Sequence, residues 1–170
     1  MNLEDTDYEP SSPVSLAILA ILSLIPHPDD PDPLNEEAVI FRRKCAQDFA
    51  QSALESIEIE SEMPESSTTP AQVLSEDQDS HLRIPFHPNV PVELESIVAL
   101  SILSVYEYAQ RGNINRMRIR ADQALMAAMN ISLHTELEAE ANDKFTEARR
   151  RVWWMTVSAR YYCIFDSRLL

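Results

Sequence analysis

Glycine is nearly missing from this sequence, with Gly112 as the single example among 170 residues. The usual share of glycine in proteins is about 7%. Tight hairpin turns and phosphate-binding loops depend on glycine, whereas helices do without it. The deficit predicts an all-α protein and argues against P-loop and dinucleotide-binding chemistry. It also leaves no G-x-S-x-G nucleophile turn, and no other nucleophile–base pair stands out, so the chain is not expected to be an enzyme.

Cysteine and histidine are also scarce. Cys45 and Cys163 lie far apart, and no CxxC pair exists, so a thiolate zinc site is not expected. Their apolar surroundings predict buried thiols in a reducing compartment rather than a disulfide. The four histidines stand away from other ligand-type residues, which predicts no metal site. His134 and Glu136 are two apart and do not face each other on a helix, so we interpret His134 as a helix-end residue.

Basic residues number only 14 against 28 acidic ones, which gives a net charge of −14. Met1 to Asn89 holds 18 acidic and 4 basic residues, whereas Val90 to Leu170 holds 10 of each. The first half should therefore repel nucleic acid and anionic membranes. The apolar run from Val14 to Ile25 is shorter than the roughly 20 residues that span a bilayer, and the acidic N-terminus does not resemble a signal peptide. We expect a soluble intracellular chain without membrane contact.

The first half predicts two helices after an acidic, disordered segment over residues 1–12. Ser12 followed by Pro13 is a helix start, and Pro26 ends that helix. Asn35 can cap the next helix. Its predicted apolar stripe has spacings of three and four residues. The stripe comprises Ala38, Phe41, Cys45, Phe49, Ala53 and Ile57. Residues 13–57 are thus expected to form the N-terminal helices of the domain.

Residues 58–87 are rich in Glu, Ser, Thr, Asp and Pro and poor in large apolar side chains. Such a segment cannot bury enough surface to offset its ordering entropy, which predicts a flexible acidic insertion. Two interpretations remain open. The segment is either an acidic regulatory or activation segment with phosphorylatable serines, or a variable surface loop.

Val92 to His134 contains the densest apolar pattern and predicts an antiparallel helical hairpin. Gly112 is placed to adopt a left-handed cap, and Asn113 or Asn115 can begin the second helix. The first helix is expected to bury Leu94, Ile97, Val98, Leu100, Ile102, Leu103, Val105 and Tyr106. The second carries a stripe of mostly small residues, which lets helices approach closely. That stripe is Met117, Ala121, Ala124, Leu125 and Ala128. The predicted fold is an all-α, multi-helix domain built around this hairpin.

A final helix is predicted after the turn at Asn142 and Asp143, with Val152, Met155, Thr156, Ala159 and Cys163 at helical spacing. Arg149, Arg150 and Arg151 are consecutive, so they point in three directions and cannot form one phosphate-binding patch. We expect at least one of them to form a half-buried pair with a carboxylate from another helix. The last residues carry no helix stop, so residues 88–170 are expected to be an incomplete domain core, truncated at the C-terminus.

Three strings, PVELESIVALSILSVYEYAQRGN, MRIRADQALMAAMNISLH and EARRRVWWMT, occur in this order. Together they resemble the middle homology region of fungal zinc binuclear-cluster transcription factors, most closely the activators of starch- and polysaccharide-degradation genes. The resemblance covers about Val14 to Phe165 and is strongest from Pro88 onward. It implies an all-α regulatory domain of a nuclear activator of RNA polymerase II transcription, gated by a small-molecule inducer or by partner proteins. Its most recognisable motif, with an expected structural role, comprises Glu147, Arg149, Arg150, Arg151, Trp153 and Trp154.

The sequence departs from that family in several places. The six-cysteine zinc cluster is missing, so zinc and DNA binding are expected only through a cluster that these residues lack. Ser132 stands where the family usually has glycine, at a cost of about 1 kcal/mol if a left-handed turn is kept. Ala159-Arg160 replaces Asp-Arg, and the Gly-Arg-Pro that follows in many members is missing. These departures favour a fragment or a degenerate relative. The alternative is a freestanding helical module that binds partners or forms a homodimer through an open apolar surface.

Overall fold

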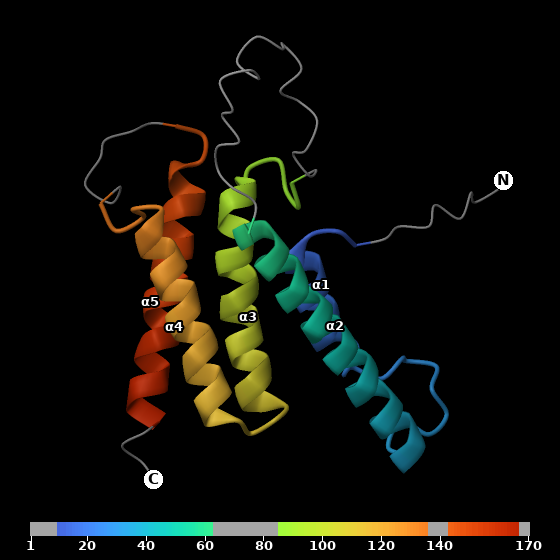
Figure 1. Cartoon of the computed structure of the whole chain (residues 1–170). Helices are drawn as coiled ribbons and strands as arrows, with labels where there is room; N and C mark the ends of the chain where they lie inside the picture. The colour runs from blue at the N-terminus through green and yellow to red at the C-terminus, as the bar shows by residue number, and fades with distance from the viewer. Residues whose placement is uncertain (1–9, 63–84, 136–142, 167–170) are drawn as a thin grey trace, which may run out of the picture.

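The computed structural model describes residues 10–62, 85–135 and 143–166, and all regular structure within these ranges is helical (Figure 1). The all-α fold class is confirmed. The elements are α1 (Pro13–Leu22), α2 (Glu36–Glu62), the 3₁₀ turn η1 (Val92–Leu94), α3 (Glu95–Ala109), α4 (Ile114–Asn130) and α5 (Thr146–Asp166). No helix in these ranges combines the length and apolar character needed to cross a bilayer.

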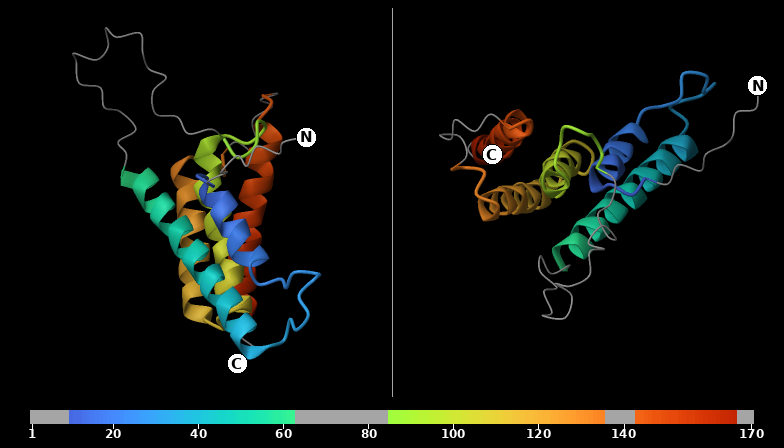
Figure 2. Two further views of the ribbon diagram at one scale, coloured as in Figure 1. Left: turned by 90° about the vertical axis from the view of Figure 1, so that its right-hand side faces the viewer. Right: turned by 90° about the horizontal axis from the view of Figure 1, so that it is seen from above.

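Helix α3 is the central element of the fold. It contacts α1, α2, α4 and α5, and its most extensive contact is with α4. Seen from above, α3 lies between the α1–α2 pair and the α4–α5 pair (Figure 2). Helices α3 and α4 run side by side in opposite directions, joined by a short turn (Figure 1). The helices therefore form a row in which α3 contacts the helices on both of its sides.

The helix ends follow local rules that the sequence predicts. The Ser12 side chain accepts a hydrogen bond from the Val14 N–H at 3.2 Å and caps α1. Asn35 accepts from the Glu37 N–H at 2.9 Å, and Asn113 accepts from the Arg116 N–H at 3.0 Å. Gly112 adopts a φ of +60°, the left-handed conformation that glycine tolerates best. These four end signals are confirmed, and α1 ends at Leu22, ahead of Pro26.

Helix α2 differs from its predicted stripe. Its buried residues are Ala46, Ala50 and Ala53, which share a core cluster with α1, whereas Phe41 is 67% exposed. The reason is length, because α1 has 10 residues and α2 has 27, so α1 cannot cover the N-terminal part of α2. Helix α2 also continues to Glu62, so the first residues of the predicted insertion are helical. Residues 63–84 of that insertion lie outside the described ranges.

The α3–α4 contact forms much as predicted. Five of the expected residues of η1 and α3 are buried, namely Leu94, Ile97, Leu100, Leu103 and Tyr106. Val105 was wrongly expected inside and is exposed. In α4, Met117, Ala121, Ala124 and Ala128 are buried, as the small-residue stripe predicts, and Leu125 is half-buried. The small residues allow the helix axes to approach closely.

Candidate functional site

The first part of α5 carries the motif singled out from the sequence, and three of its residues form a surface network. The Glu147 carboxylate accepts a hydrogen bond from Arg151 Nε at 2.7 Å and lies 3.7 Å from the guanidinium of Arg150. The hydrogen bond and charge of Arg151, assisted by Arg150, hold the pKa of Glu147 below its ordinary value. All three side chains are exposed, so the pairs contribute little to stability.

Arg149 points inward instead. Its guanidinium lies 3.3 Å from the Glu93 carboxylate and 3.5 Å from that of Asp143. Glu93 belongs to η1, 56 positions earlier in the chain, and the Arg149 side chain is only 26% exposed. The prediction of a half-buried pair between one arginine and a carboxylate of another helix is therefore confirmed. The pair ties the start of α5 to the turn that leads into α3.

The two tryptophans also separate. Trp153 is half-buried, packs against the cluster around Leu94 and Val152, and lies with its ring centroid 5.9 Å from that of His134. Trp154 is 56% exposed. The motif thus sends Arg149 and Trp153, four positions apart, towards the core and leaves its other members on the surface. These residues do not converge on one point where a substrate could react.

Glu107 forms a charged cluster that sequence reasoning missed. Its side chain is only 5% exposed and lies 3.5 Å from Arg111 and 3.8 Å from Arg116. Burial lowers the pKa of the neighbouring Arg120, while the charge of Glu107 acts in the opposite direction. The i,i+4 spacing of Glu107 and Arg111 was a signal that could have revealed this pair.

Glu95 is a second buried carboxylate that the sequence did not reveal. Its Oε2 accepts a hydrogen bond from the Ser12 hydroxyl at 2.5 Å, and its Oε1 accepts one from the Phe86 N–H at 2.6 Å. Ser12 lies 83 positions before Glu95, so no local pattern could predict this contact. The carboxylate joins the start of α1, the segment before η1 and the start of α3.

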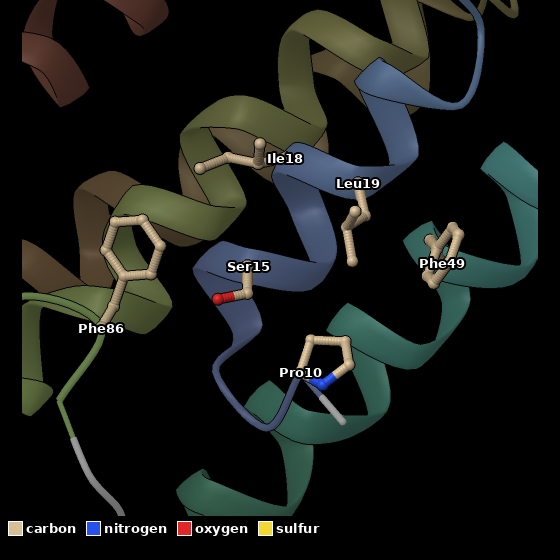
Figure 3. A pocket seen from close by; sticks show the side chains of 6 residues that line it. All are labelled: Pro10, Ser15, Ile18, Leu19, Phe49 and Phe86. Carbon is tan, nitrogen blue, oxygen red and sulfur yellow. The ribbon is translucent and has the colours of Figure 1, made fainter. Parts of the chain in front are cut away.

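A pocket of about 490 Å³ opens beside this junction. Its lining residues come from α1, from α2, from the residues just before α1 and from the segment before η1. They are Pro10, Ser15, Ile18, Leu19, Phe49 and Phe86 (Figure 3). Phe86 and Phe49 lie on opposite sides of α1, and the Ser15 hydroxyl points to the Phe86 side. Apart from that hydroxyl, the side chains facing the pocket are apolar.

A second hollow, of about 460 Å³, lies at the N-terminal end of α5. Lys144, Arg151 and Glu147 line it together with His87, Asn89, Val90 and Ala148. Glu147 already pairs with Arg151, which leaves Lys144 as the one further charged side chain of this hollow. Among the described residues, no group of three or more His, Cys, Asp or Glu is placed to hold a metal ion.

Comparisons with protein-family models, with curated proteins and with solved structures each found no match for this chain.

Proposed function

We propose that this chain is a non-catalytic regulatory body of the fungal zinc-cluster activator type, acting in the nucleus on RNA polymerase II transcription. It would reach DNA only through a zinc cluster supplied outside these residues. The carbohydrate-utilisation genes suggested by the closest branch of that family are the first candidate targets. The three strings that resemble the family support this proposal, and they supply α3, α4 and α5.

The turn after α4 is the observation that carries the proposal. Ser132 adopts a φ of +60°, at the position where the family usually has glycine. The Ser132 N–H donates to the Met129 carbonyl at 2.9 Å, and the Leu133 N–H donates to the Ala128 carbonyl at 3.0 Å. This pair of bonds defines a Schellman turn, which favours glycine at the left-handed residue. A diverged relative of that family would keep this left-handed turn even after serine had replaced the glycine.

The charges of the described residues are consistent with a domain that does not bind DNA directly. Arg149 pairs with Glu93, Arg151 with Glu147, and Arg160 with Asp122 at 2.6 Å. A DNA-binding face needs cations gathered on one surface, because phosphate contacts dominate affinity. Carboxylates of the chain itself already accompany these arginines.

A reporter experiment tests the regulatory role. The chain is inserted between an unrelated DNA-binding domain and a strong activation domain, and transcription is measured with and without starch or maltose. We expect the insert to lower transcription and the sugar to relieve it. Leu100→Asp, which places a charge in the core, should abolish the repression, and the surface change Arg150→Ala should not. Equal reporter output from the parent chain and Leu100→Asp would refute the proposal.

A binding experiment tests the missing contact with DNA. Fluorescence anisotropy of labelled duplex DNA should not change when the isolated chain is added, even at low salt. Salt-sensitive and sequence-selective binding by these residues alone would contradict this part of the proposal.

A freestanding interaction module is the second candidate, and the outer side of α5 favours it. Trp154, Tyr161 and Tyr162 are all exposed there, and aromatic residues are enriched at protein interfaces. Sedimentation equilibrium of the isolated chain should then give a dimer that Trp154→Ala weakens. Ile119→Ala, a matched change at an exposed apolar residue of α4, should leave the dimer intact. A monomer at all concentrations would remove the homodimer from consideration.

A further inference from the structure

The pocket beside Glu95 has the size and composition of a ligand site. Its volume of about 490 Å³ falls within the roughly 300–1,000 Å³ that small-molecule sites occupy. Such sites are mostly apolar and contain a few placed polar groups. Here the polar group is the Ser15 hydroxyl, and Phe49 and Phe86 provide ring surfaces on either side of α1 (Figure 3).

Ser15 supplies an unused hydrogen-bonding group at this pocket. The residue is 8% exposed, and no described residue forms a hydrogen bond with its hydroxyl. The hydroxyl faces the pocket and is not cut off from solvent, so water can hydrogen-bond to it when the pocket is empty. A ligand that carries one donor or acceptor at this point would take the place of that water.

Hydrogen bonds to Glu95 fix two of the segments that line the pocket. The Glu95 carboxylate is fully buried, and it binds both the Ser12 hydroxyl, one turn before Ser15, and the backbone N–H of Phe86. Both hydrogen bonds are short, at 2.5 Å and 2.6 Å. One side chain of α3 therefore fixes two walls, so the site does not have to be assembled by the ligand.

The charge and polarity of the surroundings limit the ligand class. No cationic side chain lines the pocket, and the first half of the chain has 18 acidic residues against 4 basic ones. An anionic ligand would therefore meet repulsion without a partner. A sugar would place many hydroxyls against apolar side chains, and Ser15 could satisfy only one of them.

We propose that this pocket binds an uncharged, mainly apolar small molecule that bears one hydrogen-bonding group, which Ser15 recognises. The ligand lies across the first turns of α1 and contacts Phe49 and Phe86. The inference goes beyond the regulatory proposal, because an apolar ligand of this class is distinct from the sugar that the reporter experiment tests. Binding is measured on the isolated chain, however, so it succeeds or fails independently of the reporter experiment.

The experiment titrates the full chain with N-phenyl-1-naphthylamine, an uncharged probe whose fluorescence rises in apolar sites and whose N–H can donate to Ser15. We expect saturable binding at one site. Ser15→Ala should weaken it about five- to tenfold, the effect of one lost hydrogen bond. Ile18→Trp, which fills the pocket, should abolish it. Ile119→Trp, a matched change on the exposed side of α4, should leave it unchanged, and circular dichroism checks that each variant is folded.

Competition separates the possible occupants. Decanol should displace the probe, whereas decanoate and maltose should not. The absence of probe binding, or binding that Ile18→Trp leaves intact, would overturn the proposal. Displacement by decanoate as effective as that by decanol would refute the uncharged class. Binding that falls as protein concentration rises would show that a second copy of the chain covers the pocket instead.

Discussion

Replacing Ser132 by glycine should stabilise the protein, although the change removes a side chain. An L-residue in the left-handed region costs about 1–2 kcal/mol, and Ser132 has a φ of +60°. Glycine avoids this cost but makes the unfolded chain more flexible, which offsets about 0.4–1 kcal/mol. Ser132 is exposed, so little packing is lost with its side chain. The net gain in the free energy of unfolding should be about 0.5–1 kcal/mol.

The assay is urea denaturation followed by circular dichroism, supported by thermal melting. For a chain of this size the expected gain raises Tm by about 1–4 °C. The matched control is Ser158→Gly, the same substitution at an exposed residue inside α5. Glycine weakens a right-handed helix relative to serine by about 0.5 kcal/mol, so this variant should be less stable.

Gly112 supplies the reciprocal test. It has the same φ of +60°, and an added Cβ would meet no atom within 4 Å. Gly112→Ala should therefore lower stability by about 1 kcal/mol through backbone strain alone, without a steric clash. If Ser132→Gly and Ser158→Gly both destabilised the chain, the left-handed turn after α4 would not be under strain, and the reasoning would be refuted.

Three further outcomes are expected. Glu107→Gln should lower the free energy of unfolding by about 1 kcal/mol in urea denaturation, because the partly exposed Arg111 and Arg116 lose the countercharge of this buried carboxylate. The exposed control Glu147→Gln should lower it less. The pKa of Glu147, followed by NMR, should lie below its ordinary value and rise in Arg151→Gln. The small stability that this carboxylate confers should be present above its unfolded pKa and disappear as the pH falls through its folded pKa. An unshifted pKa would contradict the hydrogen bond between Arg151 and Glu147. Ala124→Leu should destabilise the protein by about 1–3 kcal/mol, because a larger side chain overpacks the buried α3–α4 contact. Gln123→Leu, on the exposed side of α4, should not destabilise it. Equal melting temperatures of the two variants would show that the α3–α4 contact is loosely packed.

The sequence predicted the features whose partners lie within a few residues. Ser12, Asn35 and Asn113 cap helices through bonds to amides two or three positions ahead. Gly112 turns the chain after α3 through its own backbone freedom. Such contacts depend on local geometry alone, so composition and spacing are sufficient to predict them.

The sequence failed where burial depends on a distant neighbour. Phe41 and Val105 continue apolar patterns, yet both are exposed because no described helix covers them. Periodicity identifies the face that a helix could bury, but it does not reveal the length or position of the helix packed against it. The short α1 leaves the first part of α2 uncovered for this reason.

The candidate site divides in the same way. The sequence alone predicted an all-α chain, the caps that begin its helices and a pair between at least one arginine of α5 and a carboxylate of another helix. Only the tertiary structure decided that Arg149 reaches Glu93 while Arg150 and Arg151 stay on the surface. It alone placed Glu95 between Ser12 and Phe86 and thereby formed the pocket. The physical reason is that a buried carboxylate requires hydrogen-bond partners, and here one of them comes from 83 positions away, beyond the reach of any local pattern.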